Sequence, residues 1–91
     1  MACCLTRKSN QSIRLQSGNK TMWLKVIATR PGSAKIDIQG RTFTLYQKKP
    51  IPLITNDGPI WIELLKSTSS IAKLAIDAPP TWGIMRHELV V

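Results

Sequence analysis

The feature that most constrains the fold of this chain is an internal repeat. Trp23-Leu24-Lys25-Val26-Ile27 recurs as Trp61-Ile62-Glu63-Leu64-Leu65, 38 positions later. At the same offset Trp23–Ile38 matches Trp61–Ile76 over sixteen positions without a gap. We interpret the pattern as a tandem duplication, with chance similarity of two β-hairpins as the alternative. Each half is too small to fold alone, so the two halves are expected to close one core together.

Short apolar segments with alternating character recur along the chain and are separated by turn residues. The clearest breaks are Arg30-Pro31-Gly32, Asn56-Asp57-Gly58-Pro59 and Ala78-Pro79-Pro80. The pattern predicts eight or nine short strands, including Ile13–Gln16, Met22–Thr29, Ala34–Gln39, Thr42–Tyr46, Ile51–Thr55, Ile60–Leu65, Ala72–Ile76 and Trp82–Met85. The predicted fold is all-β, a small barrel or sandwich. Only Ile60–Lys66 also fits a helix, because its large apolar residues share a helical face.

The predicted organisation is a single domain of 91 residues, with pseudo-repeats at about 1–46 and 47–91. Its charge is distributed unevenly between these halves. The chain has 13 Lys and Arg against 5 Asp and Glu, and ten of these basic residues fall within the first fifty positions, where Asp37 is the one acid. Such a basic segment favours a polyanionic partner, with RNA or DNA ahead of a membrane surface. Solubility alone is the simpler explanation of the charge.

The sequence offers little for enzyme chemistry. His87 is its one histidine, and Cys3 and Cys4 are adjacent, which is not the spacing of a zinc or redox site. The five glycines are scattered and form no phosphate-binding loop. We therefore expect a protein that is not an enzyme and has no metal or cofactor.

No apolar run approaches the length of about 20 residues that a membrane span needs. Residues Met1–Lys8 lack the apolar stretch of a signal peptide. A cytoplasmic location without a membrane partner is the resulting expectation.

The two ends of the chain carry short motifs that together resemble one protein family. Leu5-Thr6-Arg7-Lys8 resembles an opening Leu-Thr-Arg-Arg motif. Ile76-Asp77-Ala78-Pro79 and Ile84-Met85-Arg86-His87-Glu88-Leu89 resemble an Ile-Asp-Ala-Pro segment and a closing Val-His-Arg-Glu-Glu-Ile strand. These are motifs of the carbon storage regulator (Csr/Rsm) family, small bacterial RNA-binding translational regulators. The direct resemblance covers about residues 5–15 and 60–89, and residues 22–46 join it only through the internal repeat.

The chain also departs from the family. It is longer than one family protomer and shorter than two, no C-terminal helix is expected before Val91, and Met85 replaces the usual histidine. Thr42–Lys49 would have to be both the last strand of one half and the first strand of the other. Two interpretations stay open. The chain is either a fused, monomeric pseudo-dimer that lacks one strand, or a single protomer with an insertion near 17–59 that forms a homodimer.

The resemblance implies a role in translational control. The family binds GGA triplets in hairpin loops of messenger leaders and thereby blocks initiation, at a site between the first strand of one protomer and the last strand of the other. Messenger RNA leaders and small regulatory RNAs are the implied partners, and no cofactor is needed. Carried over to this chain, the site comprises Leu5, Thr6, Arg7, Lys8, Trp82, Ile84, Arg86 and His87. Unpaired loop bases expose edges that strand backbones and arginine side chains can bind.

Two other functions stay open. A degenerate family member could act as a protein-interaction module that titrates a homologue or an antagonist. Alternatively, charge and tryptophans could bind single strands without sequence preference. Trp23 and Trp61 occupy equivalent repeat positions and are predicted to lie in the core, whereas Trp82 is a candidate for stacking on a base.

Overall fold

The computed structural model describes residues 2–87 and the side chains from Cys3 to Ile84. Within this range the chain contains no helix that could span a lipid bilayer. The nine strands of the described residues are β1 (Ala2–Lys8), β2 (Ser12–Ser17), β3 (Lys20–Arg30), β4 (Ser33–Ile38), β5 (Arg41–Tyr46), β6 (Ile51–Thr55), β7 (Gly58–Ser67), β8 (Ile71–Asp77) and β9 (Gly83–His87). The all-β prediction is confirmed, and Ile60–Lys66 lies in a strand rather than in a helix.

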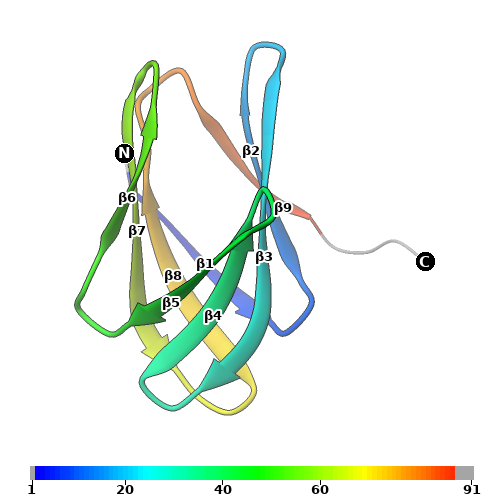
Figure 1. Cartoon of the computed structure of the whole chain (residues 1–91), viewed down its shortest axis with the longest axis vertical. Coiled ribbons are helices and arrows are strands. Elements are labelled where there is room, and N and C mark those ends of the chain that lie inside the picture. The colour runs from blue at the N-terminus through cyan, green and yellow to red at the C-terminus, as the bar shows by residue number, and fades with distance from the viewer. Residues whose placement is uncertain (1, 88–91) are drawn as a thin grey trace.

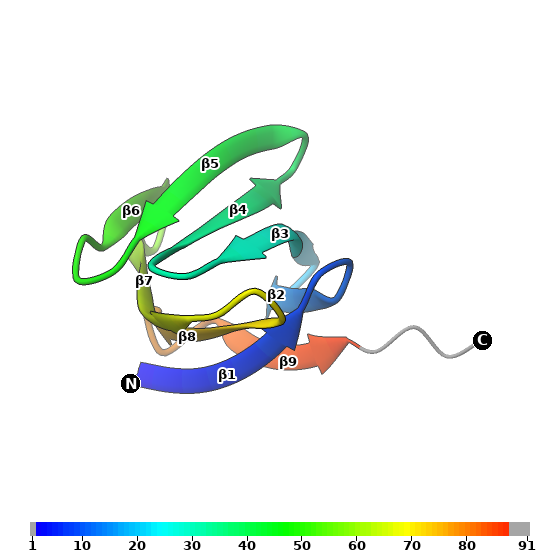
Figure 2. The same ribbon diagram turned by 90° about the horizontal axis from the view of Figure 1, so that it is seen from below.

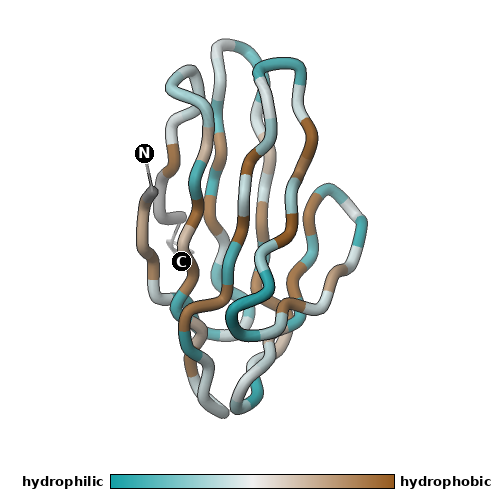
Figure 3. Tube along the Cα trace, turned by 90° about the vertical axis from the view of Figure 1, so that its left-hand side faces the viewer, coloured by the Kyte–Doolittle hydropathy of each residue, from teal (hydrophilic) through white to brown (hydrophobic). Residues whose placement is uncertain are grey.

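The strands form two antiparallel sheets that face each other (Figures 1 and 2). Sheet A has the strand order β1-β8-β7-β6, and sheet B has the order β5-β4-β3-β2-β9. Hydropathy alternates along many of the strands (Figure 3), so each sheet turns one apolar face inward. The buried core draws aliphatic side chains from both sheets, among them Ile13, Leu24 and Ile36 from sheet B and Ile62, Leu64 and Leu74 from sheet A.

The 38-residue repeat extends to the strand pairing itself. Val26 lies opposite Ile36 in sheet B, and Leu64 lies opposite Leu74 in sheet A. A β-bulge follows at the equivalent place in each half, between Val26 and Ala28 and between Leu64 and Lys66. Bulges change the direction of a strand and its side chains. Their recurrence at one offset supports the duplication and gives both sheets the same local geometry.

The 38-residue offset aligns β1 with β5, so the second half begins with β5 and not at about residue 47. With this boundary, the two halves exchange their first strands. β1 pairs with β8 of the second half, and β5, which is the repeat equivalent of β1, pairs with β4 of the first half. A two-residue turn explains the position of β5. Gln39 and Gly40, with φ angles of 55° and 82°, form a tight hairpin link that keeps β5 beside β4. The strand Thr42–Tyr46 therefore acts as a first strand.

Equivalent hydroxyl groups form hydrogen bonds between the two halves at the end of the sandwich where the β3–β4 and β7–β8 hairpins turn. Thr29 Oγ1 donates a hydrogen bond to the carbonyl oxygen of Ser69 at 3.0 Å. Its repeat equivalent Ser67 donates through Oγ to the carbonyl oxygen of Ser33 at 2.9 Å. Both donors are buried. Each half thus binds a backbone carbonyl of the other half through a hydroxyl side chain, at Ser69 between β7 and β8 and at Ser33 at the start of β4.

The prediction that Trp23 and Trp61 lie in the core is wrong. Their exposed fractions are 41% and 42%, and each lies on the outer face of its sheet. The reason is strand alternation, because Leu24 and Ile62 immediately after them point inward with no exposed surface. Equivalent positions in the repeat give the two tryptophans the same environment, but the phase of the strand makes this the outer face and not the core.

Candidate functional site

The first and last strands lie along the same side of the sandwich. β1 is the edge strand of sheet A and β9 is the edge strand of sheet B, and Figure 2 shows both strands on one side of the molecule. Cys3 of β1 and Ile84 of β9 line one cavity of about 430 Å³. The remaining lining is Ala78, Pro79, Pro80 and Trp82. Of the predicted site residues, Trp82 and Ile84 line this cavity, whereas none of the four residues Leu5–Lys8 does.

The edge strands β1 and β9 are not paired with each other. β1 pairs with β8, and β9 pairs with β2. Among residues 2–87, the second backbone edge of β1 and that of β9 carry no further strand. Edge strands offer rows of N–H and C=O groups to whatever binds beside them. This side of the sandwich can therefore accept hydrogen-bonding groups from a ligand.

The predicted residues of β1 divide between two directions. Thr6 and Lys8 are exposed, whereas Leu5 and Arg7 point inward and are buried. Arg7 is only 3% exposed. Its Nε donates a hydrogen bond to the carbonyl oxygen of Thr6 at 2.7 Å. The guanidinium thus lies beneath the exposed side of β1 and fixes one of its backbone groups.

The predicted residues of the last strand are placed only in part. Trp82 is buried, and Ile84 is half-buried against the core. The Trp82 indole also lines a second cavity of about 410 Å³ between the tips of the β2–β3 and β6–β7 hairpins. The backbones of Arg86 and His87 lie in β9, opposite Ile13 and Ser12. Their side chains lie outside the described residues.

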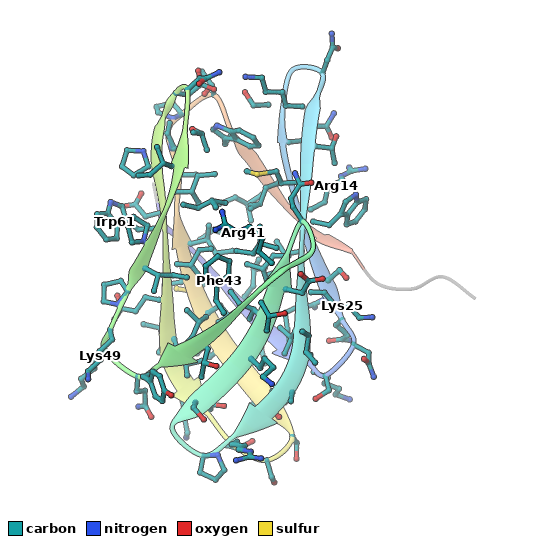
Figure 4. All side chains as sticks on the ribbon, viewed as in Figure 1. Arg14, Lys25, Arg41, Phe43, Lys49 and Trp61 are labelled. Atoms are coloured by element: carbon teal, nitrogen blue, oxygen red, sulfur yellow. The ribbon has the colours of Figure 1, made fainter. Side chains whose placement is uncertain are left out.

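The outer faces of the two sheets carry different charges, which the sequence reasoning missed. On sheet B, the Trp23 face consists of Arg14, Trp23, Lys25, Arg30, Lys35 and Asp37. On sheet A, the Trp61 face consists of Pro52, Trp61, Glu63, Ala75 and Asp77. Figure 4 shows Arg14 and Lys25 along one side of the molecule and Trp61 on the opposite side. The 38-residue offset could have revealed this difference, because it aligns Lys25 with Glu63.

The described residues contain no cluster of three or more His, Cys, Asp and Glu side chains that could hold a metal ion. Cys3 and Cys4 are free thiols, the first half-buried and the second exposed. Comparisons of the chain with protein-family models, curated proteins and solved structures gave no match. The resemblance to the Csr/Rsm family thus depends on the residues of the chain itself.

Proposed function

We propose that this protein is an RNA-binding regulator of translation that recognises GGA in leader hairpins between β1 and β9. The position of both edge strands on one side of the sandwich supports the proposal, because each strand carries part of one terminal motif. Unpaired loop bases present hydrogen-bonding edges. Thr6 and Lys8 offer a hydroxyl and a cation beside the open backbone edge of β1.

Arg7 gives the strongest support. Its repeat equivalent in β5 is Leu45, which is fully buried. Leucine is therefore sufficient for packing at this position, and a buried cation there carries a desolvation penalty. Residues that break a local packing rule in this way are expected at functional sites. We assign Arg7 the role of a positioning residue that holds the Thr6 carbonyl at the edge used by the RNA.

Binding to two matched hairpins tests the proposal. One hairpin carries GGA in its loop, and the other carries CCA with the same stem. Each lost guanine contact is worth about 1–3 kcal/mol, so the CCA hairpin should bind at least about tenfold more weakly. Equal affinities at near-physiological salt, where non-specific binding is weak, would contradict the proposal.

Substitution of Arg86 tests the site within the same experiment. Arg86→Ala should weaken GGA binding by about 1–3 kcal/mol and leave the melting temperature nearly unchanged. Lys49→Ala is the matched control, because Lys49 is an exposed cation in the β5–β6 connection, away from β1 and β9. A loss of folding in Arg86→Ala with RNA binding retained would make Arg86 a structural residue.

One observation favours a protein-interaction module as a second candidate. β6 is the repeat equivalent of β2, yet within residues 2–87 it carries no strand where β2 carries β9. Ile54 on this edge is 77% exposed. Pro52, however, lacks an N–H group and limits pairing along the edge. This candidate predicts capture of a family homologue by the RNA-free protein, with no preference between the GGA and CCA hairpins.

A further inference from the structure

The Trp23 face combines an exposed aromatic ring with several cations. Arg14 lies directly opposite Trp23 in the β2–β3 ladder, so the two side chains lie on the same face of the sheet. Lys25 is exposed two residues further along β3. Its cross-strand neighbour Asp37 is the one acid of the face. Cations beside a tryptophan are the elements with which proteins bind single-stranded nucleic acid.

A basic groove continues this face along sheet B. It has a volume of about 300 Å³ and begins after the bulge in β3. Arg30, Lys35 and the exposed ring of Tyr46 line it, together with Ala28, Ser33, Ala34 and Thr44. From Trp23 to Arg30 the strand rises about 20 Å. The Trp23 face and this groove, here called the Arg30 groove, thus form a strip long enough for several nucleotides.

The second half of the chain provides an internal comparison. Trp61 has the same strand position and nearly the same exposure as Trp23. Pro52 replaces Arg14 as its cross-strand neighbour, and Glu63 stands where Lys25 does. The groove beside Trp61, about 270 Å³, is lined by the carboxylates of Glu63 and Asp77. Carboxylates repel phosphate groups, so only one of the two tryptophan faces suits RNA.

We propose that the Trp23 face and the Arg30 groove bind the single-stranded RNA that flanks the recognised hairpin. The inference rests on the proposed function, and it adds a second contact surface on sheet B. Trp23 and Tyr46 would stack on bases of any sequence, and the basic side chains would bind phosphates. An acidic protein would satisfy the cations but would leave the two exposed aromatic rings without a matching group.

The test uses three RNAs: the GGA hairpin, the same hairpin with a single-stranded tail of about ten nucleotides, within the usual range of such sites, and the tail alone. Tails are placed at either end in turn. With the unchanged protein, one tail should raise the affinity of the hairpin at least about fivefold. Trp23→Ala should remove this gain and leave the affinity for the bare hairpin within about twofold. Lys25→Glu, which copies Glu63, should reduce the gain and its salt dependence.

Trp61→Ala is the matched control, because it removes an equally exposed tryptophan. It should leave the gain from the tail intact, and the melting temperature of each variant verifies its fold. The inference is overturned if neither tail adds affinity, if Trp61→Ala removes as much as Trp23→Ala, or if polyglutamate displaces the tail as well as competitor RNA does. A bare hairpin that fails to bind, beside Trp23-dependent binding of the tail alone, would instead overturn the proposed GGA site.

Discussion

Arg7 and Leu45 differ in chemistry although they are equivalent residues of the two halves of the molecule. They occupy equivalent positions on β1 and β5, and both are buried. Leu45 provides only packing, whereas Arg7 adds a hydrogen bond to the Thr6 carbonyl. The fold therefore requires only a buried side chain that packs at this position, and the hydrogen bond from Arg7 to the Thr6 carbonyl is an addition at the β1 edge.

Replacement of Arg7 by leucine should therefore separate stability from binding. In Arg7→Leu the free energy of unfolding should stay the same or rise by about 1 kcal/mol or more, because a buried charge gives way to an apolar side chain. Affinity for the GGA hairpin should fall at least about tenfold, since the Thr6 carbonyl loses its donor and the site loses a cation. Urea unfolding and a titration with the hairpin measure the two quantities. A large loss of stability would show that the cation is needed for folding.

At the scale of elements, the reciprocal bonds from Thr29 and Ser67 join the two halves near their turns. Thr29→Val and Ser67→Ala should each lower the free energy of unfolding by about 0.5–1.5 kcal/mol, because each removes a buried hydroxyl donor. Thr44→Val is the control, since this exposed β-strand residue should change stability by less than about 0.5 kcal/mol. Denaturant unfolding measures all three variants. Equal effects of all three would show that the two bonds contribute no stability.

The elements were largely predictable from sequence, but their partners were not. Alternation identifies strands such as Ala34–Ile38 because every second residue is apolar. It says nothing about which strand lies beside β1, since the exchange with β5 depends on the two-residue turn at Gln39 and Gly40. The direction of Trp23 depends on a different property, the phase of β3, which points Leu24 into the core and Trp23 outward. Likewise, the motifs of the candidate site were visible, whereas the burial of Arg7 required the fold.

At the scale of the whole molecule, the two sides of the sandwich are unequal. One side has β1 beside β9, and the other has β5 and β6 with no counterpart of β9 among residues 2–87. We therefore expect a monomer that binds one GGA hairpin per chain. Light scattering on the RNA complex should give the mass of one chain and one RNA. A particle of two chains and two RNAs would instead support the homodimer interpretation.

The shared register of the two halves affects how the Trp23 face and the Trp61 face can change by substitution. In a twofold homodimer every substitution appears twice, once on each side of the axis, so both faces must tolerate it. Here the two tryptophan faces have the same geometry but separate codons, and a change at Lys25 leaves Glu63 untouched. One face can acquire basic side chains while the other keeps carboxylates. Because both halves lie in one chain, two surfaces of one scaffold can differ in charge and therefore in the ligands that suit them.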